Sequence, residues 1–426
     1  MTSFRFIHAA DLHLDTPFTG VGKVNAALQQ KLQDASLAAF DNLIGAAVRH
    51  GVDFVLLAGD IYDGAERGVR AQARFVEGLR QLDRNGIQCF FIHGNHDPVS
   101  EGWSALRAED LPASAVLFDQ SDAVRVVPAV RDGEILALVH GISFRSRTEA
   151  RNLSLLFPEN RRDGQFHIGL LHCNVGGQAG HDNYAPCTLE DLCSRAIDYW
   201  ALGHIHERMV LRSADPLVLY PGNLQARRFD ECGPKGATLI RVNDRSRIEM
   251  EMLPLDEVRF AQLNIDVSGC NSLDAVFAAC ASSIALTLAQ VRPRLLVTRL
   301  RLRGQSVAHH DLLKADVQGQ LVPALRDQLP ENAVWLDQAI VATVPFVDRV
   351  EVGRSGGFEA ALVQLTDALN ASDNDSFDLQ KKVRAPLLNG TRFDDFLSDL
   401  QPITAREAVV QAEARLLGLM EMEGEE

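Results

Sequence analysis

Short apolar runs alternate with amphipathic segments over the first part of the chain. The runs FRFIHAA, VDFVLLAGD and IQCFFIHGN have the length and continuity of buried strands. Between them, apolar side chains recur at helical spacing from about Asn25 to His50 and again from about Gly68 to Arg84. Because strands and helices that alternate in this way form βαβ units, the pattern predicts a sheet that is covered by helices.

From about Ala123 onward, the predicted strands follow one another more closely. One helix is expected among them, near Thr188 to Arg195. Together with the first part of the chain, this pattern fits a mixed core of two sheets flanked by helices best. We therefore expect an α/β fold over residues 1–255, in which two sheets form a sandwich flanked by helices in the order α/β/β/α. The predicted strands are AVRVVPAV, EILALVHGI, FHIGLLHCN, YWALGHIH, PLVLYPGN, ATLIRVN and RIEMEML.

The pattern changes again at LPLDEVRF, between about Leu253 and Phe260. The sequence that follows alternates strands with helices and predicts a small α/β domain. After Pro345 the pattern becomes helical and irregular, and a last amphipathic helix is expected to begin at Thr404, its N-cap residue. The expected regions are 1–255, 260–344 and a helical C-terminal region at 345–426.

Composition places the chain among soluble globular proteins. Its 426 residues are too many for one ordinary core, and 46% hydrophobic with 23% charged residues is typical of that class. No apolar stretch of roughly 20 residues and no signal peptide stand out, so we expect a cytoplasmic protein without membrane contact. The seven cysteines form no CxxC, which argues against a disulfide framework and a zinc-thiolate site.

The formal charge of -15 means that the chain as a whole does not attract a polyanion. A phosphate-rich substrate would have to be held by bound cations or by local arginine clusters. For any one of these arginines a solvated polar face is the more ordinary explanation. The clusters are Arg145, Arg147 and Arg151; Arg227 and Arg228; and Arg299, Arg301 and Arg303.

Short polar clusters lie at the ends of five of the predicted strands: DLH, GDIYD, GNHD, LLH and GHIH. Taken singly, each is more often a turn than a ligand set. Sites assemble at strand ends in open α/β sheets, so we expect the clusters to face one another. Imidazole, carboxylate and amide ligands suit Mn, Fe or Zn better than Mg or Ca alone. The side chains with ligand chemistry are Asp11, His13, Asp60, Asp63, Asn95, His96, His172, His204 and His206.

The ordered set D-x-H, GDxxD, GNHD, H and GHxH resembles the calcineurin-like two-metal phosphoesterase superfamily over about the first 240 residues. More narrowly, DLHLDTPF, VDFVLLAGDIYD and YPGNLQARRFDECGPKG resemble the DNA-repair exonucleases of the SbcD and YhaO type. The resemblance implies one metal ion on Asp11, His13 and His206, a second on Asn95, His172 and His204, and Asp60 as the bridge between them.

The same resemblance implies that His96 is not a ligand. This imidazole would protonate the leaving oxygen or steady the phosphoryl group, and its unperturbed pKa near 6.5 suits a proton donor. Asp63 could orient His96, and a helix-capping or turn role for Asp63 is an equal alternative.

The function implied by the resemblance is that of a Mn²⁺-dependent DNA phosphodiesterase, an exonuclease of DNA repair. The C-terminal region would bind an SMC-type coiled-coil ATPase, and 260–344 would be a capping domain beside the DNA. Because the net charge of the chain is strongly negative, we expect the protein to rely on that partner for binding DNA. The alternative is a two-metal phosphoesterase that acts on a small nucleotide ester or a phosphoprotein. The oligomeric state stays open, with a homodimer as one option.

The remaining histidines are expected to be structural. His181 follows the GGQAG loop, where a solvated position is expected, and Cys173 should point away from the metal because neighbouring strand residues face opposite sides. The histidines expected in the core, within or beside apolar strands, are His8, His93, His140 and His167.

Overall fold

The computed structural model describes residues 2–22, 24–64, 68–99, 110–160, 164–178, 182–330, 332–371, 412–413 and 416–417. The chain divides into two compact units. The first comprises Met1–Ala261 with Val291–Val297, and the second comprises Gln262–Gln290 with Thr298–Glu426. The helix expected from Thr404 begins outside the described residues, and His181 also lies outside them.

The first unit contains two six-stranded sheets. In one sheet the order is β12-β11-β1-β2-β3-β4, with β1 to β4 parallel and β11 antiparallel to both β1 and β12. The strands β1, β2 and β3 are those expected of βαβ units, whereas β4 was not predicted from the sequence. The bounds are β1 Phe4–Ala9, β2 Phe54–Ala58, β3 Gln88–Ile92, β4 Ala115–Phe118, β11 Gly236–Val242 and β12 Ile248–Pro254.

The second sheet has the order β5-β6-β7-β8-β10-β9. Its central strands β6, β7, β8 and β10 run parallel, and β5 and β9 pair antiparallel at the edges. The bounds are β5 Arg125–Arg131, β6 Glu134–Gly141, β7 His167–His172, β8 Tyr199–Gly203, β9 Met209–Arg212 and β10 Leu217–Tyr220.

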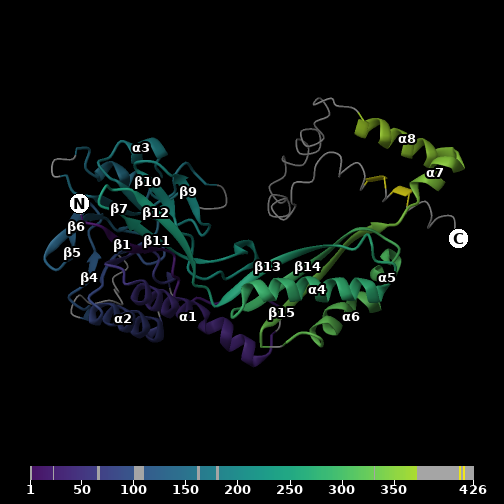
Figure 1. Ribbon diagram of the computed structural model, residues 1–426, viewed down its shortest axis with the longest axis horizontal. Helices are drawn as coiled ribbons and strands as arrows, with labels where there is room; N and C mark the ends of the chain where they lie inside the picture. The colour runs from purple at the N-terminus through teal and green to yellow at the C-terminus, as the bar shows by residue number, and fades with distance from the viewer. Residues whose placement is uncertain are drawn as a thin grey trace. The chain divides into compact units, whose positions relative to one another are not determined.

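Helices cover the outer faces of both sheets (Figure 1). On the first sheet, α1 (Ala26–His50) and α2 (Val69–Arg84) bury a shared apolar layer with β1, β2 and β3. On the second sheet, η3 (Leu153–Leu156) and α3 (Leu189–Cys193) cover Trp200 and its neighbours. Aromatic residues such as Phe6, Phe54 and Tyr199 fill the layer between the sheets. The α/β/β/α sandwich predicted from the sequence is therefore confirmed.

The helix α1 illustrates how the sequence pattern produces the fold. The Asn25 side chain accepts a hydrogen bond from the backbone N–H of Leu28 at 2.8 Å, which caps the helix start. Gly51 ends the helix with a φ of 54°, a left-handed conformation that glycine adopts without steric cost. The apolar stripe predicted for this segment, Leu28, Leu32, Phe40, Leu43, Ile44 and Ala47, is buried.

The second unit is built on the three-stranded sheet β13-β14-β15. Helices α4, α5 and α6 connect its strands, and α7 and α8 follow. Arg349 at the start of α7 forms ion pairs with Asp367 of α8 and with Glu413. The bounds are β13 Val258–Asp266, α4 Leu273–Val291, β14 Leu295–Ser306, α5 His309–Leu313, α6 Ala315–Arg326, β15 Val334–Pro345, α7 Arg349–Ser355 and α8 Gly357–Ala371.

The helix α4 corrects one sequence expectation, namely that no apolar stretch reaches the length of a membrane span. Within the described part of the chain, α4 is long and apolar enough to do so, with a mean hydropathy of 1.5 over its most apolar window. Its buried side chains Val276, Cys280, Ile284 and Leu288 recur every four residues. That spacing is typical of a helix that packs along one side against a protein core.

Candidate metal centre

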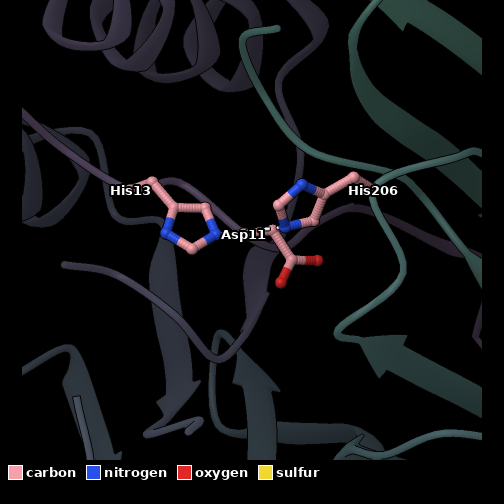
Figure 2. Close-up of side chains that lie close together, drawn as sticks. All are labelled: Asp11, His13 and His206. Carbon is pink, nitrogen blue, oxygen red and sulfur yellow. Dashed lines mark hydrogen bonds between the residues drawn. The ribbon is translucent and has the colours of Figure 1, made fainter. Parts of the chain in front are cut away.

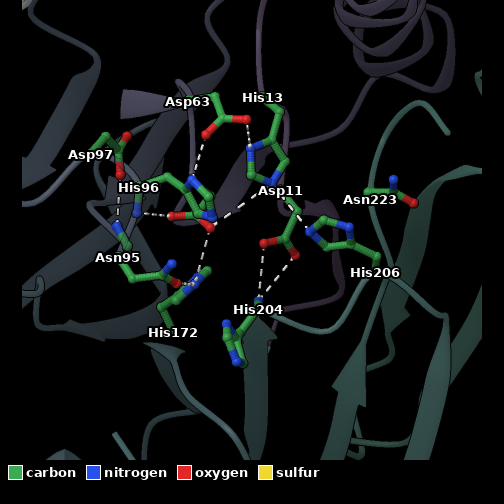
Figure 3. Close-up of polar contacts among 12 residues, drawn as sticks. Asp11, His13, Asp63, Asn95, His96, Asp97, His172, His204, His206 and Asn223 are labelled. Carbon is green, nitrogen blue, oxygen red and sulfur yellow. Dashed lines mark hydrogen bonds and ion pairs between the residues drawn. The ribbon is translucent and has the colours of Figure 1, made fainter. Parts of the chain in front are cut away.

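The predicted site residues lie at the carboxyl ends of five parallel strands. Asp11 and His13 follow β1, Asp60 and Asp63 follow β2, and Asn95 and His96 follow β3. His172 ends β7, and His204 and His206 follow β8. Figure 3 shows that the labelled side chains among these, which follow strands of both sheets, converge on one place, and Asp60 lies among them, close to His13 and His172. The convergence expected of the strand ends is therefore found, while the role of each side chain stays a prediction.

The backbone at the site is held in unusual conformations. Asp11, His13, Asp60 and His204 have positive φ angles of 51°, 42°, 52° and 105°. Non-glycine residues seldom adopt such angles, and where they do the strain is concentrated at functional sites. The loops are fixed by hydrogen bonds from the N–H of Asp11 to Gly59 O and from the N–H of His13 to Asp60 O, both at 3.1 Å.

Two glycines allow the loops to approach one another. A Cβ added at Gly203 would lie 1.9 Å from the Ala58 carbonyl oxygen and 2.8 Å from Nδ1 of His172. A Cβ added at Gly94 would lie 2.3 Å from Oδ1 of Asp60. A side chain at Gly203 would have to displace backbone and one at Gly94 would have to displace the Asp60 carboxylate, so the glycines of the GNHD and GHIH motifs serve close packing around the site.

The first ligand group consists of Asp11, His13 and His206. Their ligand atoms all lie within 4.8 Å of one another, and Figure 2 shows the two imidazoles beside the Asp11 carboxylate. Nε2 of His13 lies 3.2 Å from Nε2 of His206. Burial holds the pKa of His13 well below its usual value, so this ring is neutral at pH 7. Two facing ring nitrogens can share only one proton, whereas a divalent cation accepts both lone pairs.

The second group is centred on His172. Its Nδ1 donates to the backbone oxygen of Ala58 at 2.9 Å, and its Nε2 lies 3.0 Å from Oδ1 of Asn95 and 3.4 Å from Oδ2 of Asp60. Burial opposes a charge on His172, but the Asp60 carboxylate outweighs it and raises the pKa of His172 to about 9. The lone pair on Nε2 of His172 and the two facing oxygens repel one another unless a positive charge lies among them. A divalent cation meets this requirement, because imidazole, amide and carboxylate groups are donors that such cations bind.

Asp60 lies between the two groups. Its Oδ2 is 3.9 Å from Nε2 of His13 and 3.4 Å from Nε2 of His172. Although burial opposes ionisation of Asp60, the neighbouring imidazoles, His172 foremost, hold its pKa well below the usual value. An ionised carboxylate in this position fits the bridging role that the sequence resemblance implies.

His204 contributes a different ring nitrogen. Its Nε2 is hydrogen-bonded to the backbone oxygen of Asp182 at 2.8 Å, so Nε2 carries the proton and Nδ1 carries the ring lone pair. The ring centroid lies 5.3 Å from that of His172. His204 therefore lies beside the second group, although it does not belong to the tightest clusters found among the described residues.

His96 and Asp63 form a hydrogen-bonded pair. Nδ1 of His96 lies 2.5 Å from Oδ1 of Asp63, and Oδ2 of Asp63 accepts a hydrogen bond from Nη1 of Arg227 at 2.9 Å. Burial disfavours the charged His96 ring, but the Asp63 hydrogen bond and the Asp60 charge raise the pKa of His96 above its usual value. The His96 side chain is 41% exposed, which leaves the ring accessible from the cleft.

The centre opens into a cleft of about 400 Å³. Asp60, Asn95, His96, His204 and His206 line it. The cleft is also lined by Thr16, Pro17, Thr19, Asp63, Asp182, Tyr184, Arg227 and Arg228.

Three further residues support the site, and two of them, Lys235 and Glu231, were not singled out from the sequence. Asp97 accepts hydrogen bonds from the N–H groups of Gly94 and Ile61, at 2.8 and 3.0 Å, and so joins two site loops. Lys235 donates to the His206 carbonyl at 2.7 Å. Glu231 hydrogen-bonds to His206, and although burial opposes its charge, that contact lowers the pKa of Glu231 to about 2. The position of Asp97 within GNHD was a usable signal, whereas no local pattern marks Glu231 or Lys235.

The histidines expected in the core occupy buried positions. His8 is fully buried and contacts the Tyr199 hydroxyl at 2.9 Å and the Leu202 carbonyl at 3.1 Å. His140 and His167 are hydrogen-bonded to each other at 2.9 Å. Cys173 belongs to the apolar layer outside the second sheet, as expected, with its Sγ 3.9 Å from Sγ of Cys187.

The arginine clusters mostly form ion pairs within the protein. Arg145 and Arg151 pair with Asp122, and Arg299 pairs with Asp337. Of the arginines named from the sequence, Arg227 and Arg228 line the cleft.

Comparisons with known proteins agree with this geometry. The profile of the calcineurin-like phosphoesterase family matches residues 4–208, and that of the middle domain of metallophosphoesterase YhaO matches residues 260–344. The uncharacterized metallophosphoesterase YhaO of Bacillus subtilis is 35% identical over 340 residues, which cover 79% of this chain and 81% of that protein. The chain therefore belongs to the calcineurin-like metallophosphoesterase family, whose members are hydrolases that use divalent metal ions.

More distant relatives are DNA double-strand break repair proteins by name. The DNA double-strand break repair protein Mre11 of Thermoplasma acidophilum is 26% identical over 266 residues, covering 59% of this chain and 66% of that protein. Mre11 of Sulfurisphaera tokodaii is 25% identical over 253 residues, covering 56% and 60% respectively. These matches span less than two thirds of either archaeal protein.

Proposed function

We propose that the protein is a Mn²⁺-dependent DNA phosphodiesterase, specifically an exonuclease of DNA repair. The observation that carries the hydrolytic part is the arrangement of two ligand groups around Asp60 with a non-ligand imidazole, His96, held beside them by Asp63. The DNA substrate is supported by the similarity to Mre11 proteins. Manganese suits the mixed imidazole, carboxylate and amide donors.

The residues divide the work of phosphodiester hydrolysis. One divalent cation would be held by Asp11, His13 and His206, and the other by Asn95, His172 and His204. Asp60 would contact both cations. When bound, such a pair activates water and neutralises charge on phosphoryl oxygens. His96 has its Nδ1 fixed by Asp63, so its Nε2 is the nitrogen that gives a proton to the departing sugar oxygen.

The acidic chain must hold a polyanion through local features. Besides the proposed cations, Arg227 and Arg228 are the arginines among the described residues that line the cleft, and Arg227 already pairs with Asp63. With a formal charge of -15, this protein gains little DNA affinity from its overall field. That balance supports reliance on a partner for DNA capture. We place this activity in the cytoplasm.

The partner we propose is an SMC-type coiled-coil ATPase that binds the region of α7 and α8. Large apolar side chains are exposed there: Phe346, Val350, Phe358 and Leu365 are 51%, 63%, 63% and 56% exposed. Phe358 and Leu365 are seven residues apart on α8 and therefore lie on one face of the helix. An exposed apolar helix face of this kind supports binding of a helical partner.

One observation favours a second candidate, a phosphoesterase for small nucleotide esters or phosphoproteins. The cleft volume of about 400 Å³ lies within the range of small-molecule pockets, roughly 300–1,000 Å³.

A side-by-side assay tests the proposal. Purified protein with Mn²⁺ is offered labelled single- and double-stranded DNA and, separately, bis-p-nitrophenyl phosphate, with and without the ATPase encoded in the same genome. Progressive loss of nucleotides from DNA ends, abolished by EDTA and by His96→Ala, is the expected result. His310→Ala, which removes an exposed imidazole of α5, is the matched control and should retain full activity. Cleavage of the small ester with intact DNA under every condition would select the second candidate.

A further inference from the structure

Glu231 is a buried carboxylate directly behind His206. Its side chain is 5% exposed and belongs to the short 3-10 helix η4 (Phe229–Glu231). Its Oε1 accepts a hydrogen bond from Nδ1 of His206 at 2.7 Å. Its Oε2 accepts hydrogen bonds from Nδ2 of Asn223 at 3.1 Å and from the backbone N–H of Arg227 at 2.7 Å. Donors hold both oxygens, so the carboxylate cannot turn away from His206 without losing several hydrogen bonds.

This contact selects the ring nitrogen that His206 presents to the site. An ionised carboxylate only accepts hydrogen bonds, so the ring proton lies on Nδ1 and the lone pair lies on Nε2. That Nε2 faces His13 at 3.2 Å, in the group that includes Asp11 (Figure 2). The His206 backbone is held as well, because its carbonyl accepts hydrogen bonds from Nζ of Lys235 at 2.7 Å and from the N–H of Asn223 at 3.2 Å.

The second ligand group is supported differently. His172 and His204 each hydrogen-bond to a neutral backbone oxygen, those of Ala58 at 2.9 Å and Asp182 at 2.8 Å. A carboxylate partner makes an imidazole a more basic ligand than a carbonyl partner does. The group that contains His206 should therefore hold its cation more tightly than the group that contains His172.

We propose that Glu231 is a positioning residue that orients His206, and that it makes the two cation positions unequal in affinity. The tighter position is that of Asp11, His13 and His206. The inference depends on the two-cation hydrolase proposed above, but not on DNA as the substrate.

Metal binding tests the inference directly. Metal-stripped full-length protein is titrated with Mn²⁺, and the free ion is followed by its electron paramagnetic resonance signal. The natural protein should show two affinity classes. In Glu231→Ala the Mn²⁺ affinity of the tighter class should fall by about 10- to 100-fold, and that of the weaker class should change by less than about twofold. In Glu231→Gln the affinity of the tighter class should lie between those of the natural protein and Glu231→Ala, because glutamine keeps an acceptor without the charge.

Glu149→Gln is the matched control. Glu149 has the same 5% exposure, and its carboxylate contacts Arg151 instead of a ligand histidine, so its loss should leave both classes unchanged. The inference would be overturned if the natural protein bound both cations with equal affinity. It would also be overturned if the Glu231 variants bound Mn²⁺ as the natural protein does, or if both classes weakened alike. If circular dichroism shows that Glu231→Ala does not fold, Glu231→Gln decides. Unequal, Glu231-dependent binding without DNA cleavage would reject the DNA substrate and leave this inference standing.

Discussion

The backbone N–H of His204 donates to both carboxylate oxygens of Asp11, at 3.1 Å each. The two residues lie 193 positions apart and follow strands of different sheets, and both have positive φ angles, 51° for Asp11 and 105° for His204. Strained backbone of this kind persists only where the surrounding structure over-determines it. The contact therefore joins the two halves of the sandwich at the metal centre.

Gly203→Ala should disrupt this junction. Its new Cβ would lie 1.9 Å from the Ala58 carbonyl oxygen, a backbone atom that cannot move alone. We expect a loss of about 3 kcal/mol in the free energy of unfolding, at the upper end of overpacking effects. Denaturant unfolding measures the change. Gly319→Ala in α6, where no atom lies within 4 Å of an added Cβ, should be neutral or slightly stabilising.

His96→Ala should lower kcat by about 10²- to 10⁴-fold on a substrate with a poor leaving group, because a proton donor contributes that much. The loss should be much smaller on bis-p-nitrophenyl phosphate, whose nitrophenolate departs without a proton. Asp63→Asn should lie between, since it keeps the shape of Asp63 but not the charge that holds Nδ1 of His96. Equal losses on both substrates would assign His96 to steadying the phosphoryl group instead.

Mn²⁺ should stabilise the folded protein, because the ligands meet only in the folded state. A ligand at 100 times its Kd adds about 2.7 kcal/mol to the free energy of unfolding, which raises Tm measurably. Asp60→Asn should remove most of this increase, since Oδ2 of Asp60 lies close to both His13 and His172. Asp41→Asn, which removes an exposed carboxylate paired with Arg74, should retain the full increase. Chelator-treated and Mn²⁺-loaded samples are compared by differential scanning calorimetry.

His8 should make stability depend on pH. Burial lowers the pKa of folded His8 to about 3, whereas the unfolded value is 6.5. Between these values the unfolded chain binds a proton that the folded chain does not, so the contribution of His8 is complete above pH 6.5 and is lost as the pH falls towards 3. The effect is on the order of 1.4 kcal/mol for each pKa unit. Urea unfolding across this window should show a shallower loss in His8→Gln, while His310→Gln should follow the natural protein.

Phe358→Asp and Leu365→Asp should weaken binding of the coiled-coil ATPase. A charge on the exposed apolar face of α8 would have to be desolvated on contact with an apolar partner surface. Hydrolysis of bis-p-nitrophenyl phosphate should not change, because these residues belong to the other unit from the metal centre. Leu286→Asp, at a 66% exposed position on α4, is the control. Undiminished binding by the double variant, measured by calorimetry, would remove this face as the docking site.

Local pattern determined the architecture and most of the site. Each motif ends an apolar strand, and the carboxyl ends of parallel strands meet at one edge, so Asp11, Asp60 and Asn95 could be expected to converge. The apolar stripe of α1 likewise encodes its own packing face. These features could be predicted from the sequence, because the spacing of apolar residues and the order of the strands along the chain are properties of the sequence itself.

Only the tertiary structure decided how the ligands are supported. Glu231 reaches His206 across 25 residues, and Arg227 reaches Asp63 across 164. The Asp182 carbonyl determines which ring nitrogen of His204 carries the proton. No periodicity marks such contacts, because a hydrogen bond between distant segments depends on where loops come to rest after the sheets have packed. The sequence by itself therefore identified which residues meet. The tertiary structure decided which ring nitrogen each histidine presents, and it decided the charge and the backbone conformation of the site residues.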